Sequence, residues 1–222
     1  MKKVVIFGIG DSAELAKYYL ETDPKYINDY EVVGFCIDKE YRKADIFLGK
    51  PLINFEDIEE IFPPKEYYLF NTLGYSKINT LREKKYLEGK EKGYKYINYI
   101  SSKAIVLGEV DGENNFIEEG AIIQPFSKIG NNNVIRYGSA IGHHSEIQSN
   151  CFIAPKVSIA GRVLIKNNCF LGINSTILDH LVLEERTLAG GGTLIRRNTE
   201  KEQVIIGNDS IKIKKKSIEM KI

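Results

Sequence analysis

Apolar residues recur along this chain in two different patterns, and the change falls near residue 100. Up to that point, short apolar runs alternate with segments whose apolar positions follow helical spacing. The runs predict strands at residues 4–7, 30–38, 67–70 and 94–100, and the helical spacing predicts helices at 12–20, 55–62 and 77–92. Strands alternating with helices indicate a small Rossmann-like parallel sheet, so we predict an α/β domain over residues 1–100.

From Ile117 the period becomes six. One large aliphatic residue occupies each sixth position, and the register returns once more at Ile195; the series is Ile117, Ile123, Ile129, Ile135, Ile141, Ile147, Ile153, Ile159, Ile165, Leu171, Ile177 and Leu183. A second series of mostly small residues follows four positions after each of these: Ala121, Ser127, Asn133, Ser139, Ser145, Cys151, Val157, Val163, Cys169, Ser175, Leu181 and Thr187. Isoleucine and leucine fill only about a fifth of an ordinary sequence, so such a run does not arise by chance.

A six-residue period with one large and one small residue is typical of the hexapeptide β-helix. Each unit supplies one face, and three units make a triangular coil of about eighteen residues with the aliphatic side chains stacked inside. We therefore predict a left-handed parallel β-helix within residues 101–222, with a short tail after Thr199 for which no element is predicted. A sandwich of short strands would require a period of two with turn clusters between the strands.

Composition adds little to this picture. The chain has 222 residues, 43% of them hydrophobic and 27% charged, and a formal net charge of +1. This balance favours neither nucleic acid nor an anionic membrane as a partner, and the basic run at residues 212–216 is interpreted as a solvated terminus. The apolar segment after Met1 is too short for a signal peptide, and no run reaches membrane-spanning length, so a cytoplasmic location is expected.

Cysteine and histidine usage argues against a metal site. Cys36, Cys151 and Cys169 are too few and too irregularly spaced for a disulfide framework or a zinc site. Two of them occupy small-residue positions of the repeat, which predicts packed, reduced thiols. The chain has only three histidines, two of them adjacent, so a zinc site built from three histidines is not expected.

Three stretches of the repeat carry a family resemblance. They are I-G-H-H-S-E-I at residues 141–147, N-C-F-L-G-I-N-S at 168–175 and L-A-G-G-G-T at 188–193. Over essentially its whole length the chain resembles the bacterial hexapeptide-repeat sugar acyltransferases, which include sialic acid O-acetyltransferases and N-acetyltransferases of nucleotide-linked amino sugars. The resemblance implies a homotrimer with active sites between subunits, and acetyl-CoA as the acyl donor.

The resemblance also implies a general base. His143 aligns with the family's catalytic histidine, and a neutral imidazole can accept the proton that an attacking amine or hydroxyl loses. Many relatives place a carboxylate directly after that histidine, whereas this chain has His144. Glu146 is the nearest acid and a third candidate for the catalytic group. His144 is expected either to bind substrate or to be simply exposed, and His180 is interpreted as a surface residue.

Small residues of the repeat are the candidates for cofactor contact. Gly161 is expected to donate its backbone N–H to the oxyanion formed on the thioester carbon. The pantetheine arm is expected to lie over a set of residues whose small size allows close approach to the backbone. These are Ala154, Gly172, Ile173 and Gly191. Corner geometry of the repeat is an equally good explanation for Gly172.

The N-terminal Gly8-x-Gly10-x-x-Ala13, with Asp38 at the end of the second predicted strand, is a weakened dinucleotide fingerprint. A domain of about a hundred residues is too small for the complete NAD-binding fold. The resemblance instead implies that this domain holds the nucleotide of a nucleotide-linked sugar. The residues that would line this site are Gly8, Gly10, Ser12, Asp38 and Lys39, with Asn71 and Gly74 as further lining residues. Tight turns of a purely structural unit are the alternative interpretation.

The function expected from these features is transfer of an acyl group, acetyl in the first instance, from acyl-CoA to the amino group of a nucleotide-linked amino-deoxy sugar. Acylation of a sugar hydroxyl is a second possibility, because a histidine base serves either acceptor. A non-catalytic nucleotide-binding solenoid is a third. Relatives often carry Gly-x-Pro-Ala after the β-helix, whereas this chain has Gly207-Asn208-Asp209-Ser210, so C-terminal cofactor contacts stay open.

Overall fold

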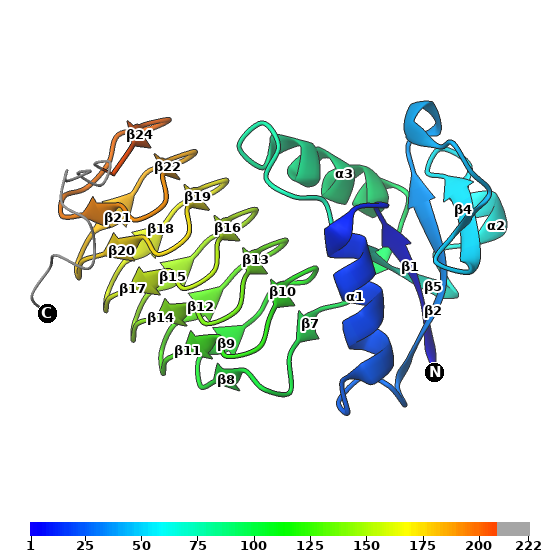
Figure 1. Cartoon of the computed structure of the whole chain (residues 1–222), viewed down its shortest axis with the longest axis horizontal. Helices are drawn as coiled ribbons and strands as arrows, with labels where there is room; N and C mark the ends of the chain where they lie inside the picture. Colours follow the sequence, from blue (N-terminus) through cyan, green and yellow to red (C-terminus); the bar gives the residue numbers. More distant parts are fainter. Residues whose placement is uncertain (208–222) are drawn as a thin grey trace, which may run out of the picture.

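Two regions follow one another along the chain, a twisted sheet with helices and a long triangular coil (Figure 1). The structure is a computed structural model and describes residues 1–207. The basic run at residues 212–216 lies outside the described part. So do residues 208–210 of the Gly207-Asn208-Asp209-Ser210 stretch.

The first region is a parallel sheet with strand order β4-β2-β1-β5-β6, extended at one edge by the antiparallel β3. Its strands are β1 (Lys2–Phe7), β2 (Tyr30–Ile37), β3 (Ile46–Phe47), β4 (Lys50–Asn54), β5 (Tyr67–Asn71) and β6 (Lys95–Tyr96). Its helices are α1 (Asp11–Thr22), the four-residue α2 (Ile58–Ile61), α3 (Thr80–Glu91) and the 3-10 turn η1 (Lys39–Tyr41). The strand-helix alternation is as predicted, but β3 and β4 were not predicted, and α2 and α3 are shorter than the predicted helices.

Alternation along β1 explains why helices lie on both faces of this sheet. Val4 and Ile6 are buried in the core that also contains α1, whereas Val5 and Phe7 are buried in the core that contains α2 and Tyr86 of α3. Successive side chains of a strand point to opposite faces, so a fully apolar strand requires cover on both.

The predicted strand at residues 94–100 is in fact two strands that belong to different sheets. β6 pairs with β5, whereas β7 (Tyr99–Ile100) pairs with β10 (Phe116–Ile117) of the coil. The chain therefore passes from one region to the other between Tyr96 and Tyr99.

The second region is a parallel β-helix of two-residue strands in three sheets. The first sheet contains β7, β10, β13 (Val134–Ile135), β16 (Phe152–Ile153), β19 (Phe170–Leu171), β22 (Leu188–Ala189) and β24 (Val204–Ile205). The second contains β8 (Ile105–Val106), β11 (Ile122–Ile123), β14 (Ala140–Ile141), β17 (Ser158–Ile159), β20 (Thr176–Ile177) and β23 (Leu194–Ile195). The third contains β9 (Glu109–Val110), β12 (Lys128–Ile129), β15 (Glu146–Ile147), β18 (Leu164–Ile165) and β21 (Val182–Leu183).

The hexapeptide register predicted from Ile117 is confirmed. Phe116 pairs with Val134, eighteen residues further on, and the same offset recurs through the middle coils. Every member of the aliphatic series is buried, and so is the small series apart from Leu181, which is half-buried. Cys151 and Cys169 are buried free thiols, as predicted.

The β-helix begins one coil earlier than its sequence period. β7 and β8 pair with the next coil at an offset of seventeen residues, and β9 pairs at an offset of nineteen. This uneven first coil, from Tyr99 to Val110, breaks the six-residue period and hides the strands from sequence analysis.

Each corner of the β-helix turns through a residue with positive φ, and the three corners use different residue types. The glycine corner has Gly120, Gly138, Lys156, Asn174 and Gly192. The asparagine corner has Asn114, Asn132, Asn150 and Asn168, followed by Arg186 and Glu202 in the last coils. The histidine corner has Phe126, His144, Arg162 and His180. The left-handed conformation suits glycine and asparagine and is costly for most other residues; the histidine corner differs from the other two in having neither glycine nor asparagine at any of these positions.

The asparagine corner joins the β-helix to α3. Asn114 Nδ2 donates to Asn132 Oδ1 at 2.6 Å, and Asn132 Nδ2 donates to Asn150 Oδ1 at 2.7 Å. Asn150 and Asn168 then both donate to the carboxylate of Glu83, at 3.1 and 2.9 Å. This amide ladder satisfies the buried corner and ties it to the N-terminal region.

Arg82 of α3 is fully buried between the two regions. Its guanidinium donates to the carbonyl oxygens of Asn132, Asn150 and Cys151, at 3.3, 2.7 and 3.1 Å. Asn79 donates to two further carbonyl oxygens of the next coil. One continuous core contains both α1 and the β-helix interior, so the two regions are packed as a unit. No helix within residues 1–207 is long and apolar enough to cross a membrane.

Candidate active site

His143 lies on the outer surface of the β-helix, at the histidine corner between β14 and β15. Its backbone N–H donates to Gln124 Oε1 at 3.0 Å, and its carbonyl oxygen accepts from the Arg162 N–H at 2.9 Å. These bonds to the coils on either side hold the backbone, while the imidazole stays exposed. The predicted general base is therefore accessible to a ligand outside the coil.

Gly161 provides the space for the imidazole ring. A Cβ atom at this position would lie 2.6 Å from Cε1 and 2.7 Å from Nε2 of His143, far inside van der Waals contact. Within residues 1–207 the N–H of Gly161 has no hydrogen-bond acceptor. The Gly161 backbone therefore lies beside the imidazole, and its role as oxyanion donor stays a prediction.

The two adjacent histidines contact each other directly. Nδ1 of His143 lies 3.0 Å from Nδ1 of His144, and the ring planes are nearly perpendicular, at 88°. The other side of His144 packs against Phe126 of the preceding coil, with ring centroids 4.7 Å apart. Neither Phe126 nor Gln124 was predicted as a site residue, because their proximity follows from the eighteen-residue offset and not from a motif.

Glu146 is not brought to the histidine pair. It lies on β15 with its side chain exposed, in register with Lys128 and Leu164 of the neighbouring coils. Among the described residues it has no hydrogen bond to either histidine. The strand geometry explains this, because residue 146 points outward from the third sheet while residues 143 and 144 belong to the turn before it.

The residues predicted to contact the pantetheine arm lie at a different corner of the coil. Gly172, Ile173 and Gly191 surround the glycine corner, between the first and second sheets, and not the histidine corner. Ile173 is 49% exposed and Gly191 is exposed, so both can contact a ligand. A single chain therefore does not bring His143 and these residues to one surface.

Two members of the pantetheine set have structural explanations. Ala154 is 6% exposed and belongs to the buried core, which accounts for a small residue at this position. A Cβ on Gly172 would lie 2.6 Å from the backbone nitrogen of Gly191, so the close stacking of coils requires glycine there. The corner interpretation of Gly172 is thus sufficient.

The predicted nucleotide residues gather at the carboxyl ends of β1, β2 and β5. The chain leaves β1 toward β2 and later crosses to β5 on the other side, so this edge includes the switch point at which open α/β sheets bind ligands. Gly10 begins α1 with open space around it, and Gly74 is equally open. Ser12 accepts a hydrogen bond of 2.6 Å from Arg136 of the β-helix, a residue that the sequence did not single out.

Gly8 and Asn71 at this edge have structural roles. Gly8 has φ of +123°, and a Cβ there would lie 2.9 Å from Thr72 Oγ1. Asn71 is 2% exposed, and its side-chain Nδ2 donates to the Arg82 carbonyl oxygen at 2.9 Å. The prediction that Asn71 lines a ligand site does not fit this burial, because the adjoining carbonyl oxygen and N–H also bond to Asn114.

Asp38 opens on a cavity of about 560 Å³ that also contains Lys85, Phe55 and Glu56. Nζ of Lys85 lies 2.6 Å from Asp38 Oδ1 and sits over the ring of Phe55, at 5.4 Å. Burial opposes the charge of Lys85, but its ion pairs with Asp38 and Glu88 raise the pKa of that ammonium. The exposed Lys39 donates its N–H to Glu56 at 3.0 Å. Lys85 is thus a further cationic candidate that lacks a sequence signal.

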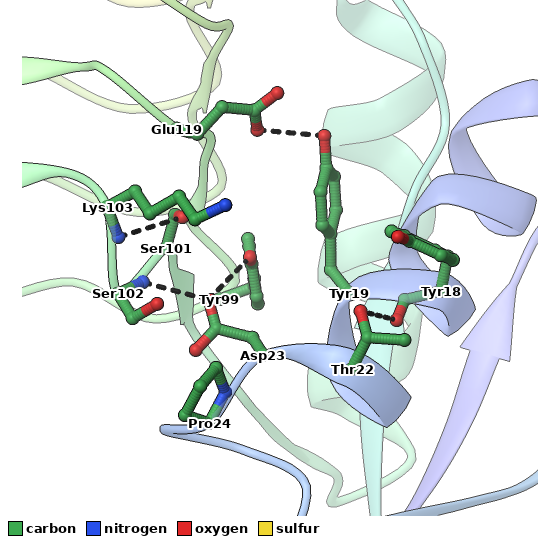
Figure 2. A pocket seen from close by; sticks show the side chains of 10 residues that line it. All are labelled: Tyr18, Tyr19, Thr22, Asp23, Pro24, Tyr99, Ser101, Ser102, Lys103 and Glu119. Carbon is green, nitrogen blue, oxygen red and sulfur yellow. Dashed lines mark hydrogen bonds between the residues drawn. The ribbon is translucent and has the colours of Figure 1, made fainter.

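A second cavity, of about 360 Å³, lies at the far end of α1 between the two regions (Figure 2). Tyr19 donates to Glu119 at 2.9 Å across it, and Asp23 accepts from Tyr99 at 3.0 Å and from the Ser102 N–H at 2.8 Å. None of the predicted site residues lines this cavity. Its polar groups are engaged in joining α1 to the first coil.

A small parallel α/β sheet joined to a triangular parallel β-helix defines the class of protein to which this chain belongs by fold. No protein-family profile matches the sequence, and no curated protein matches it. Within residues 1–207 no cluster of three or more histidine, cysteine or acidic residues could hold a metal ion.

Solved structures with the same two-part architecture do match. One is a variant of perosamine N-acetyltransferase from Caulobacter crescentus in complex with CoA and GDP-perosamine, with a TM-score of 0.81 and 22% sequence identity over 93% of this chain and 94% of that chain. Another is the acetyltransferase domain of PglB from Neisseria gonorrhoeae in complex with acetyl coenzyme A, with a TM-score of 0.80 and 15% identity over 93% and 96%. WeeI from Acinetobacter baumannii matches with a TM-score of 0.74 and 15% identity over 93% and 97%. These likenesses show the fold of the whole described chain.

Proposed function

We propose that this protein is an acyl-CoA-dependent N-acyltransferase, with acetyl-CoA as donor, that acts on the amino group of a nucleotide-linked amino-deoxy sugar. The observation that carries the proposal is the exposed imidazole of His143 beside the free N–H of Gly161, on a fold that solved proteins use to bind CoA and GDP-perosamine. In this reaction the imidazole accepts a proton from the attacking amine, and the N–H of Gly161 stabilises the oxyanion. The C–N bond forms, the C–S bond breaks, and the proton passes to the CoA thiolate.

We further propose that the site is completed by a second copy of the chain in a cytoplasmic homotrimer. His143 lies at the histidine corner, whereas the exposed Ile173 and Gly191 lie at the glycine corner of later coils. If neighbouring β-helices pack with the histidine corner of one against the glycine corner of the next, a thioester beside Ile173 can reach an imidazole across the interface. Small or apolar outward residues on the intervening second sheet, including Ala140, Ser158 and Leu194, favour such packing.

The nucleotide is proposed to bind at the carboxyl edge of the sheet. Open space at Gly10, the unoccupied first N–H groups of α1 and Arg136 beside Ser12 suit a diphosphate. Asp38 and Lys85 in the neighbouring cavity suit the polar edge of a base. Nothing in these contacts selects one base over another.

Release of free CoA thiol from acetyl-CoA tests the reaction. The purified chain would be assayed against nucleotide-linked amino sugars and their hydroxy counterparts, with mass analysis of the product. Turnover with an amino sugar that disappears in His143→Ala supports the proposal, provided that the variant sediments as the same oligomer. Turnover with hydroxy sugars alone would assign O-acylation, and nucleotide-sugar binding without turnover of any acceptor would assign a non-catalytic solenoid.

A further inference from the structure

The histidine pair poses a question of proton placement. Nδ1 of His143 and Nδ1 of His144 are 3.0 Å apart, a hydrogen-bond distance, and neutral imidazoles can share only one proton between these two atoms. Whichever ring donates must carry its proton on Nδ1, and the accepting ring must carry its own on Nε2. The tautomers of the two histidines are therefore coupled.

The ring of His144 is held in place by contacts outside the pair. Phe126 packs against it at 4.7 Å with an interplanar angle of 34°, although Phe126 itself is 71% exposed and contributes little to the core. The backbone of His144 has φ of +56°, and its N–H donates to the Pro125 carbonyl oxygen at 3.3 Å. The left-handed conformation costs a bulky residue conformational free energy. In this case the conformation directs the His144 ring toward the proposed base.

The surroundings of the pair favour the neutral form of His144. Burial of part of the ring, then the cation of Arg162 on the next coil and the adjacent His143, lower the pKa of His144. No carboxylate among the described residues forms a hydrogen bond or ion pair with either ring; Glu146 points outward from β15, and Asp179 lies beside His180. A neutral His144 with its own proton on Nε2 has a lone pair on Nδ1, and this atom can accept a hydrogen bond from His143.

We propose that His144 is a positioning residue that fixes the tautomer of His143. It accepts the Nδ1 proton of His143, so that Nε2 of His143 carries a lone pair and is the atom that takes the substrate proton. When Nε2 accepts that proton, the Nδ1–H donation to His144 persists, so no second proton transfer is needed. This role rests on the proposed function of His143 as a base, and it gives the orienting part to an uncharged ring.

The tautomer can be measured without any substrate. Protein labelled with ¹⁵N-histidine contains only three imidazoles, and His180→Gln and His144→Asn assign their signals. We expect His143 to show a protonated Nδ1 and an unprotonated Nε2 in the full chain at neutral to mildly alkaline pH. In His144→Phe, which keeps an aromatic ring beside Phe126 but removes the acceptor, His143 should change to a mixture of tautomers. Phe126 occupies the equivalent position of the preceding coil with φ of +64°, so the corner accommodates phenylalanine. A protonated Nε2 in the unmodified chain, or an unchanged tautomer in His144→Phe, would overturn the proposal.

Kinetics of the same variants separate positioning from substrate binding. We expect His144→Phe to lower kcat by about 10- to 100-fold with little change in KM, the size of effect typical of groups that orient a functional histidine. His144→Asn should recover much of that loss, because its carboxamide oxygen can accept the same proton. His144→Asp should be active with the acidic limb of its pH–rate profile moved to higher pH, because a carboxylate stabilises the imidazolium. His180→Gln serves as the control and should match the unmodified chain.

The two proposals fail in different ways. A rise in KM alone in His144→Phe would make His144 a substrate contact and overturn the positioning role. The expected tautomer in a protein that acylates none of the sugars would overturn the proposed reaction and support the pairing. Unchanged kinetics in every His144 variant, alongside an active wild type, would overturn the positioning role and leave the acyltransferase assignment intact.

Discussion

The asparagine corner and the histidine corner answer the same backbone requirement in opposite ways. Both turn once per coil through a residue with φ near +60°. At the asparagine corner the amides are buried and bonded to one another, and asparagine tolerates this conformation well. At the histidine corner the residues are phenylalanine, histidine and arginine, all of them exposed, with Phe126 packed on His144. Left-handed backbone costs such residues about 1–2 kcal/mol each, so the histidine corner carries more backbone strain than the four asparagine positions.

The largest effect should come from removing the proposed base. His143→Ala is expected to lower kcat/KM for acyl transfer by about 10² to 10⁴-fold, the usual contribution of a general base. Thiol release measures the loss, and circular dichroism with sedimentation verifies fold and assembly. Because His143 is exposed, the thermal midpoint should barely change. Full activity in this variant would remove the functional meaning of the histidine corner.

Substitution of Gly161 tests the space beneath the imidazole. In Gly161→Ala the new methyl group would meet the ring of His143 at 2.6 Å, so the ring must move. Activity is expected to fall by about 10²-fold, since a displacement of about 1 Å can cost that much. The matched change Gly142→Ala would instead meet the Ala160 backbone at 2.4 Å and should destabilise the coil. Equal stability losses in both variants, measured by urea unfolding, would contradict this distinction.

The next largest effect is expected in the free energy of unfolding, which should depend more on the asparagine corner than on the histidine corner. Asn132→Ala removes two side-chain hydrogen bonds of the buried ladder, and we expect it to lower the free energy of unfolding by about 2–3 kcal/mol. Arg162→Ala, at the equivalent position of the histidine corner, should change it by no more than about 0.5 kcal/mol. Denaturant unfolding of the two variants measures both values. Similar losses would mean that the histidine corner also contributes to stability.

The smallest expected effect is the relief of backbone strain. His180→Gly replaces an exposed residue with φ of +60° by one that adopts this conformation freely, and it should raise the free energy of unfolding by about 0.5–1 kcal/mol. Asn174→Gly, with φ of +56° at the glycine corner, should gain less because asparagine already tolerates the turn. Thermal denaturation of the pair reports the difference, and a larger gain at Asn174 would count against strain at the histidine corner.

Sequence analysis predicted the β-helix because its core has a strict linear period. Ile117 and the residues in register with it stack at a constant offset, so local spacing determines the three-dimensional contacts. The first coil was not predicted because its offsets of seventeen and nineteen residues break that period. β3 and β4 were not predicted because Gly49 and Pro51 divide the apolar residues of segment 46–54 into two short runs.

The candidate site was predictable only as a set of residues and not as an arrangement. The motif pointed to His143 and Gly161, which the structure places in contact. It grouped them with Ile173 and Gly191, which lie at another corner, because a linear motif does not say which corner a residue occupies. The packing of Phe126 on His144 and the link between Arg136 and Ser12 join distant positions, so no local pattern reveals them.

The order of residues in the α3 contacts has a consequence for biosynthesis. A ribosome delivers Asn79, Arg82 and Glu83 before the coils whose carbonyl and amide groups they bind. Arg82 bonds to the coils of Asn132 and Asn150, Glu83 to those of Asn150 and Asn168, and Asn79 to that of Asn168, so the three side chains together span three successive coils. Helix α3 and the preceding Asn79 can therefore act as a template during translation. The hydrogen-bonding groups for these three coils are present before the coils themselves are synthesised. A nascent chain would then assemble its solenoid by sequential addition along a preformed edge and would need no search over the whole molecule.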